Sequence, residues 1–166
     1  MPLLEHDGAV VSSTSIRARL ASGDIEGANE LLGHAYELRG IVAEGRHDGR
    51  ELGFPTANIH VETSLRALDD GVYAAYAEVD GRVFRAAASM GESPYFAEEG
   101  AASCEVHLLD FDQDIYGKPL QVRFYRRLRP LIAFKTLGDL KATVQDNIAW
   151  VRDNMPCSEE YVRGGA

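Results

Sequence analysis

Hydrophobic positions recur at two different periods along the chain. In segments 13–23 and 24–33 apolar residues recur every three or four positions, as in a helix that buries one face. Serine and threonine residues begin the first segment and Asp24 begins the second, and these are preferred N-cap residues. Gly23 and Gly33 are typical of helix ends. The pattern predicts two short helices near the N-terminus.

The middle of the chain instead favours β-strands, with alternating or continuous apolar runs bounded by turn residues. The clearest case is "GVYAAYAEVDGRVFRAAAS", where Asp80-Gly81 predicts a type I′ hairpin turn. About six strands are expected, near 36–42, 57–61, 71–79, 82–89, 103–111 and 119–128. No βαβ alternation is present, and closure into a small antiparallel barrel protects the edges of many short strands. The expected fold is mainly β.

After residue 135 the period returns to that of a helix. Thr136 and Asp139 resemble a capping box, and Pro156 ends the run. The apolar face expected to pack on the barrel consists of Leu137, Leu140, Val144, Ile148 and Val151. Segment 156–166 is expected to be a flexible tail, and the first twelve residues contain too little apolar content for a domain of their own.

Composition narrows the class of protein. The 166 residues are 45% hydrophobic and 26% charged, which is typical of one globular domain with some structure attached. A net charge of -9 argues against a nucleic-acid partner, because phosphate backbones attract basic surfaces. Two cysteines without metal-type spacing favour a reducing cytoplasm, and neither a membrane-spanning run nor a basic signal-peptide start is present.

The stretch "RHDGRELGFPTANIHV", residues 46–61, is the first candidate for chemistry. Gly49, Gly53 and Pro55 shape a specific turn, whose backbone N–H groups can bind a phosphate. Thr56 and Asn58 follow two residues apart, so in an extended segment both side chains project to one side. Their neutral oxygens suit Mg²⁺ when a substrate phosphate supplies the charge. The alternative is an ordinary tight turn whose side chains bond their own backbone.

Glu105 is the second candidate. In "SCEVHLLDF" the side chains of Cys104 and Val106 share a face that is expected to be core, and Glu105 and His107 share the other. A carboxylate on a rigid strand can take a proton from an attacking hydroxyl. The alternatives are a solvent-facing glutamate and a structural histidine.

The third candidate is "RRLRPLIAF". Arg126, Arg127 and Arg129 can pair with phosphate or stack on a planar ring. The alternative is a solvated strand end whose arginine stems cover apolar surface, with Phe134 in the core.

Read together, these pieces resemble the riboflavin kinase (flavokinase) family, especially the kinase module of bacterial bifunctional riboflavin kinase/FAD synthetases. The motif "LGFPTAN" stands intact at residues 52–58, followed in order by "EVHLLDFDQDIYG" and by "RRLRP" with Phe134 and a helix. The resemblance covers residues 32–153. It implies a six-stranded antiparallel Greek-key barrel with helices packed outside.

The resemblance also implies roles for single residues. Glu105 is expected to be the base that deprotonates the ribityl 5′-hydroxyl of riboflavin, and Thr56 and Asn58 are expected to hold Mg²⁺ and the ATP phosphates. The further expected ATP-binding residues are Gly45, Gly49, Gly53, Pro55 and Tyr116. Arg129 and Phe134 are expected on the flavin side.

The N-terminal piece "SSTSIR" resembles the end of the adenylyltransferase domain of bifunctional relatives. The expected division is therefore a remnant of that domain with connecting helices at 1–32, the kinase barrel with its helix at 33–155, and the tail. FAD synthetase activity is not expected from this chain, although an adenylyltransferase domain is a candidate partner. Three residues depart from the family pattern, namely Asp48, Glu92 and Leu131.

The expected function is phosphate transfer from ATP to riboflavin, giving FMN, with Mg²⁺. Two other readings remain open: a non-catalytic flavin- or nucleotide-binding regulatory module, and a plain β-barrel interaction domain.

Overall fold

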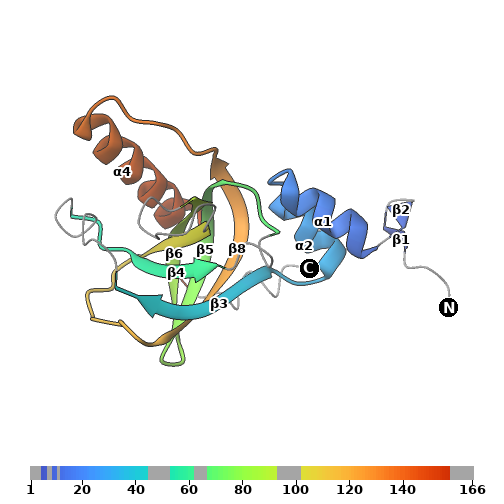
Figure 1. Ribbon diagram of the computed structural model, residues 1–166, viewed down its shortest axis with the longest axis horizontal. Helices are drawn as coiled ribbons and strands as arrows, with labels where there is room; N and C mark the ends of the chain where they lie inside the picture. Colours follow the sequence, from blue (N-terminus) through green and yellow to red (C-terminus); the bar gives the residue numbers. More distant parts are fainter. Residues whose placement is uncertain are drawn as a thin grey trace.

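A computed structural model describes residues 5–6, 9–10, 12–44, 53–61, 67–92 and 102–157. Two helices precede a β-barrel, and a longer helix follows it (Figure 1). A two-stranded ladder of β1 (Glu5–His6) and β2 (Ala9–Val10) precedes the first helix, and the sequence pattern did not predict it. Such short strands carry too few residues for a hydrophobic period.

The two N-terminal helices form as their cap residues predict. Helix α1 (Ser13–Ala21) begins at Ser12, whose side chain makes a capping box with Ser15. Helix α2 (Ile25–Leu32) begins at Asp24, whose carboxylate accepts a hydrogen bond from the Gly27 amide. Gly33 ends α2 with a φ of 71°, in the left-handed region that glycine adopts without strain.

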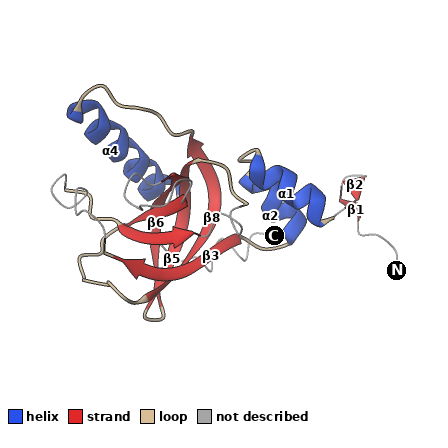
Figure 2. Cartoon of the chain, in the orientation of Figure 1, coloured by secondary structure: helices blue, strands red, loops and turns tan. Residues whose placement is uncertain are grey.

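Six strands close into an antiparallel barrel (Figure 2). Around the barrel the order is β3 (Tyr36–Ala43), β4 (Ala57–Val61), β7 (Ala102–Leu108), β6 (Arg82–Glu92), β5 (Gly71–Val79) and β8 (Pro119–Arg129), which pairs again with β3. The prediction of a mainly β, six-stranded Greek-key barrel is confirmed. The predicted hairpin turn is confirmed as well, because Asp80 and Gly81 both have positive φ, as a type I′ turn requires.

Alternation along each strand separates an interior from an outer face. On β4 and β7 the interior side chains are fully or almost fully buried, and they include Ile59, Cys104 and Val106. The residues between them, such as Asn58 and Glu105, are only half-buried. They project from the outer face, because successive side chains of a strand point to opposite sides.

Helix α4 (Leu137–Asn154) covers part of the outer face through its C-terminal half. Val151 is buried there against Ala74 and Tyr76 of β5. The Tyr76 hydroxyl donates a hydrogen bond to the Pro156 carbonyl at 2.7 Å, and Arg85 of β6 donates to the Arg152 carbonyl at 2.9 Å. These contacts fasten the C-terminal end of α4 to the barrel.

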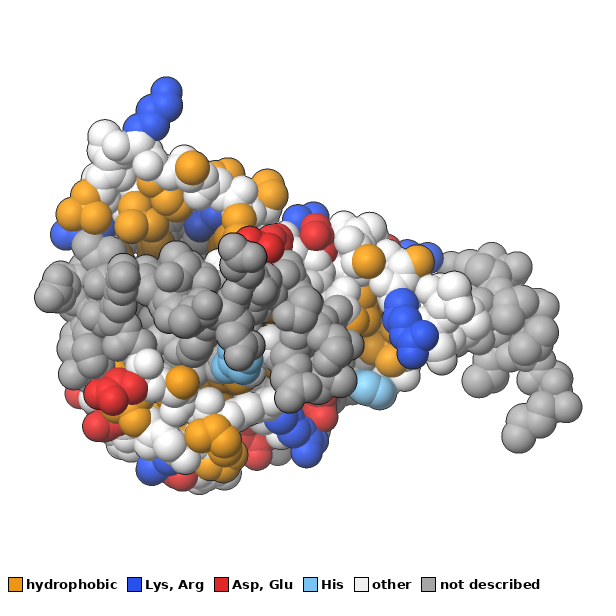
Figure 3. Space-filling model, in the orientation of Figure 1, with side chains coloured by type: hydrophobic (Ala, Val, Ile, Leu, Met, Phe, Trp, Pro, Cys, Tyr) orange, Lys and Arg blue, Asp and Glu red, His pale blue; other side chains and the backbone are white. Residues whose placement is uncertain are grey.

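The start of α4 departs from the predicted packing. Leu137 is 58% exposed. Leu131 and Ile132, in the segment that leads into the helix, are exposed as well. Figure 3 shows hydrophobic side chains gathered over α4 at the upper left of the molecule. The prediction that this helix packs on the barrel is confirmed by Ile148 and Val151, whereas Leu137, at the start of the predicted face, is exposed.

Among the described residues, no helix is long and apolar enough to cross a membrane.

Candidate active site

Asn58 and Glu105 are direct partners in the β4–β7 ladder. Opposite residues of an antiparallel pair project to the same face, with Cβ atoms about 5 Å apart. The sheet therefore brings the amide of one predicted site residue beside the carboxylate of another, although they lie far apart in the sequence.

This pair belongs to a row of cross-strand partners on the outer face. Glu105 pairs with Ser89 of β6, Ser89 pairs with Val72 of β5, and Val72 pairs with Arg129 of β8. We call these residues, with Asn58, the outer row. Glu105 and Arg129 are three strands apart in the closed six-stranded barrel, so they belong to different sides of it. The outer row runs around the barrel from the predicted metal and catalytic residues to the predicted flavin side.

The segment before β4 supplies Thr56. Gly53 has a φ of 87°, and a Cβ there would meet nothing within 4 Å, so the requirement for glycine comes from the backbone angle. Thr56 is half-buried and lies two residues before Asn58. Residues two apart in extended chain project to one side, which is the basis of the prediction that this hydroxyl and this amide act together.

His107 contacts this segment from β7. Its Nδ1 lies 2.8 Å from the Pro55 carbonyl oxygen, and its ring meets the Phe54 ring edge-on at 6.2 Å between centroids. Burial lowers the pKa of His107, while the Pro55 carbonyl and Asp110 oppose that shift and Arg152 adds to it. The sequence pattern indicated only a structural histidine here.

The end of β8 carries Arg129. Its guanidinium lies 5.6 Å from the centre of the Phe134 ring and donates a hydrogen bond to the Pro130 carbonyl at 3.1 Å. Burial lowers the pKa of this guanidinium. Among the described residues, its buried Nε has no hydrogen-bond partner. An arginine that is stacked on an aromatic ring and has a buried N–H without an acceptor suits a planar polar ligand.

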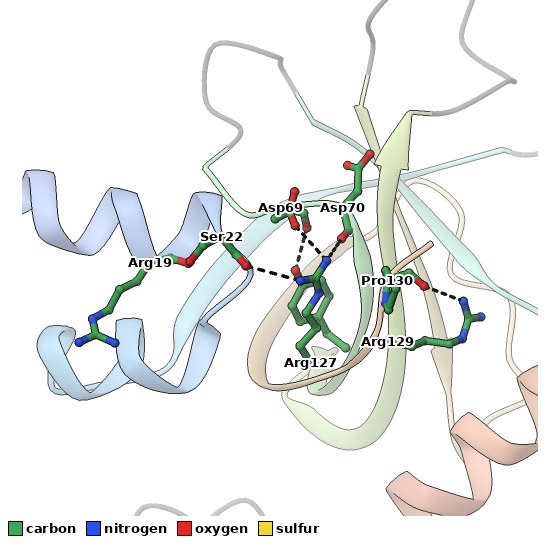
Figure 4. Close-up of polar contacts among 8 residues, drawn as sticks. Arg19, Ser22, Asp69, Asp70, Arg127, Arg129 and Pro130 are labelled. Carbon is green, nitrogen blue, oxygen red and sulfur yellow. Dashed lines mark hydrogen bonds and ion pairs between the residues drawn. The ribbon is translucent and has the colours of Figure 1, made fainter. Parts of the chain in front are cut away.

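Arg127 has a different role from Arg129 (Figure 4). Its Nη2 donates to the Asp69 carboxylate at 2.9 Å and to the Asp70 carbonyl at 2.7 Å. Its Nη1 lies 3.5 Å from the Ser22 carbonyl, in the turn between α1 and α2. Arg127 therefore ties the helical pair to the barrel, which is a structural task.

Arg126 reaches neighbouring elements from the same strand. Its guanidinium lies 3.6 Å from the Glu26 carboxylate of α2 and 5.4 Å from the centre of the Trp150 ring of α4. Neither Arg126 nor Arg127 belongs to the outer row.

Tyr116 lies in the loop between β7 and β8. Its ring packs against the interior cluster of the barrel, and its amide donates to the Asp114 carboxylate. The next residue, Gly117, donates a hydrogen bond to the Val42 carbonyl of β3. Val42 is followed by Ala43, which pairs with Asn58. The loop is thus close to the start of β4, and an adenine contact by Tyr116 stays a prediction.

Two departures from the family pattern fall on described residues. Glu92 is exposed at the end of β6. Leu131 packs on Gly91, because a Cβ at that glycine would collide with the Leu131 side chain. The leucine therefore contacts the barrel at Gly91, although much of its side chain is exposed. Three predicted residues, Gly45, Gly49 and Asp48, lie outside the described residues.

The oxygen atoms of the Thr56, Asn58 and Glu105 side chains suit a Mg²⁺ ion that is also bound to phosphate. In the described part of the chain, no group of three or more histidine, cysteine, aspartate and glutamate side chains could hold a metal by itself. Thr56 and Asn58 offer neutral hard oxygens, and Glu105 adds a carboxylate beside Asn58. Such a set suits a metal that arrives with phosphate ligands.

The sequence of the chain is similar to those of known proteins. The sequence model described as "Flavokinase: Riboflavin kinase" matches residues 32–155. The chain belongs to the riboflavin kinase family. Among curated relatives, the bifunctional riboflavin kinase/FMN adenylyltransferase of Bacillus subtilis is 39% identical over 137 residues, which make up 81% of this chain and 43% of that protein.

The corresponding protein of Pseudomonas fluorescens is 38% identical over 149 residues, or 90% of this chain and 48% of the relative. The chain thus spans less than half the length of these two relatives. Their names join the riboflavin kinase to a second activity.

Two solved structures resemble the fold. A riboflavin kinase from Trypanosoma brucei aligns with a TM-score of 0.54 at 25% identity, over 75% of this chain and 81% of that one. A Streptococcus pneumoniae protein named as a macrolide-efflux protein aligns with a TM-score of 0.83 at 33% identity, over 94% of this chain and 51% of that one. Efflux is named for that protein, whereas the family match and the curated relatives concern riboflavin kinase.

Proposed function

We propose that this chain transfers the γ-phosphate of ATP to the 5′-hydroxyl of riboflavin, giving FMN and ADP. The observation that carries the proposal is the cross-strand pair of Asn58 and Glu105 on the outer face of a riboflavin kinase barrel. It supports a catalytic carboxylate next to a phosphate-binding segment.

Glu105 is the proposed general base. It accepts the proton of the ribityl hydroxyl, whose oxygen forms a bond to the γ-phosphorus while the bond between that phosphorus and the β,γ-bridging oxygen breaks. A strand interior is a rigid place for such a group, and β7 is held on both sides, by β4 and β6. Rigid positioning of the hydroxyl in line with the phosphorus is the main contribution of the protein.

Thr56 and Asn58 are the proposed ligands of Mg²⁺. The ion supplies positive charge to the β- and γ-phosphates when it is bound. The proposed arch over these phosphates includes Gly45, Gly49, Gly53 and Pro55, and Tyr116 is the proposed adenine-side residue. No lysine occurs before Lys118, so charge neutralisation in the arch relies on amides, arginine and the metal.

Arg129 and Phe134 are proposed to bind the flavin. Their stacked pair lies at the far end of the outer row from Asn58. An isoalloxazine ring is planar and carries carbonyl acceptors, so it can meet both an aromatic face and a guanidinium donor.

The relatives' names join riboflavin kinase to FMN adenylyltransferase. An adenylyltransferase domain that uses the FMN made here is therefore the proposed partner of this module. The function is tested by incubating the chain with riboflavin, ATP and Mg²⁺ and separating the products by chromatography. Equal amounts of FMN and ADP are expected; binding of riboflavin without turnover would instead support a regulatory module.

A further inference from the structure

His107 lies two residues after Glu105 on β7, and both side chains project from the outer face. Its partner on β6 is Ala87, which packs in the cluster beneath α4. On the other side, the last ladder pair between β4 and β7 is Ala57 with Val106. The histidine therefore lies between the α4 cluster and the segment that leads into β4, whose Pro55 carbonyl it contacts.

Thr56 precedes the first residue of β4, so the strand ladder does not itself fix its position. A contact that holds the neighbouring backbone is needed to place its hydroxyl relative to Glu105. His107 makes such a contact, since its Nδ1 is 2.8 Å from the Pro55 carbonyl oxygen. A carbonyl only accepts hydrogen bonds, so Nδ1 carries the proton and donates it.

The Phe54 ring strengthens this attachment. It meets the His107 ring edge-on, with an angle of 84° between the ring planes. Edge-to-face pairs restrict both rings. Two contacts from one side chain thus hold consecutive residues, Phe54 and Pro55, immediately before Thr56.

We propose that His107 is a positioning residue of the kinase site: its Nδ1–H holds the Pro55 carbonyl and so fixes Thr56 relative to the ladder pair of Asn58 and Glu105. The role rests on the proposed function, because Thr56 and Asn58 matter for rate only if they bind the nucleotide phosphates. A merely structural histidine would stabilise the barrel without a preference for one substrate.

Two substitutions separate these roles. His107→Leu removes the donor and keeps much of the volume. His107→Asn keeps a donor, because its amide nitrogen lies close to the position of Nδ1. The matched control is His34→Leu, since His34 also contacts a backbone carbonyl through Nδ1, that of Ala35, but at the junction of α2 and β3.

In the kinase assay, His107→Leu is expected to lower kcat/KM for Mg-ATP by roughly three- to tenfold, the equivalent of one neutral hydrogen bond. The KM for riboflavin is expected to stay within about twofold, since a segment that binds phosphate does not touch the flavin. His107→Asn is expected to recover most of the loss, and His34→Leu to behave as the unmodified chain.

Amide hydrogen exchange provides a readout that does not depend on turnover. Peptides covering residues 53–58 are expected to exchange faster in His107→Leu than in the unmodified chain and His107→Asn, with β5 and β8 unchanged. If His107→Leu does not fold, His107→Gln replaces it, because its amide is one bond longer and misses the Pro55 carbonyl.

Equal losses of kcat/KM in His107→Leu and His107→Asn would overturn the proposal. Equal losses of kcat/KM for Mg-ATP and for riboflavin would overturn it too, and so would unchanged amide exchange in residues 53–58. If the unmodified chain makes no FMN, the proposed function fails and the assignment of His107 to catalysis fails with it. The exchange experiment then still shows whether His107 holds the segment.

Discussion

Asn58 and Glu105 face each other across the β4–β7 ladder, on the outer face of the barrel. The amide comes from the segment "PTAN" and the carboxylate from "EVH", and only long-range strand pairing joins them. This pair places the proposed phosphate-binding segment beside the proposed base.

Replacing Glu105 by glutamine removes the base while keeping size and hydrogen-bonding capacity. We expect kcat to fall by about 10²- to 10⁴-fold, the usual contribution of general base catalysis, with riboflavin binding retained. Steady-state kinetics and calorimetry measure the two quantities. Glu26→Gln on α2 is the control, because Glu26 is exposed and lies outside the outer row. A near-normal rate in Glu105→Gln would exclude this residue as the base.

Thr56→Val removes a hydroxyl with little change of shape. Since that oxygen is a proposed ligand of Mg²⁺, we expect kcat/KM for Mg-ATP to fall by about ten- to a hundredfold, as for one hydrogen bond to a charged group. A titration of activity with Mg²⁺ should show a higher metal requirement. Thr143→Val on α4 is the matched control. Identical Mg²⁺ curves for the two variants would argue against Thr56 as a ligand.

Arg127 and Arg126 provide a paired test of stability. Arg127→Gln leaves the Asp69 carboxylate and two carbonyls without their common donor, so we expect a loss of about 2–3 kcal/mol in the free energy of unfolding. Arg126→Gln breaks one exposed ion pair, 3.6 Å long, and one cation–π contact with Trp150, and should cost about 1 kcal/mol. Urea denaturation measures both. Similar losses in the two variants would show that Arg127 does not tie the helices to the barrel.

The two cysteines should differ in reactivity. Burial raises the pKa of Cys104 to about 12, with Glu105 adding to the shift, whereas Cys157 is exposed. We expect a thiol reagent at pH 8 to modify one cysteine in the folded chain and two in urea, as counted by mass spectrometry. Rapid modification of Cys104 in the folded chain would contradict its position inside the barrel.

The same pKa shift links stability to alkaline pH. Between the ordinary value of 9.0 and about 12, the unfolded thiol ionises while the folded thiol stays protonated, so the free energy of unfolding falls as pH rises. Below pH 9 this contribution is fully present. Cys104→Ala should lose less stability over this range, which denaturation at several pH values can show.

Local patterns predicted most of the elements. Asp24 and Thr136 cap their helices, Asp80-Gly81 forms the expected turn, and the strand alternation separates Cys104 from Glu105 as predicted. These features depend on neighbours in the sequence, where propensity and period carry the information.

Strand register and tertiary contacts could not be predicted from the sequence pattern. No local signal indicates that Ser89 pairs with Glu105, or that His107 reaches Pro55, because both depend on which strands are adjacent. Leu137 fits a helical period, yet it is exposed, because α4 contacts the barrel mainly through its C-terminal half.

The fate of the phosphate tests the central claim most directly. The chain is incubated with riboflavin, Mg²⁺ and ATP labelled in the γ-phosphate, and the flavins are separated by chromatography. Our account predicts that the label appears in FMN with the unmodified chain and is nearly absent from it with Glu105→Gln. Unlabelled flavin with the folded, unmodified chain would contradict the account.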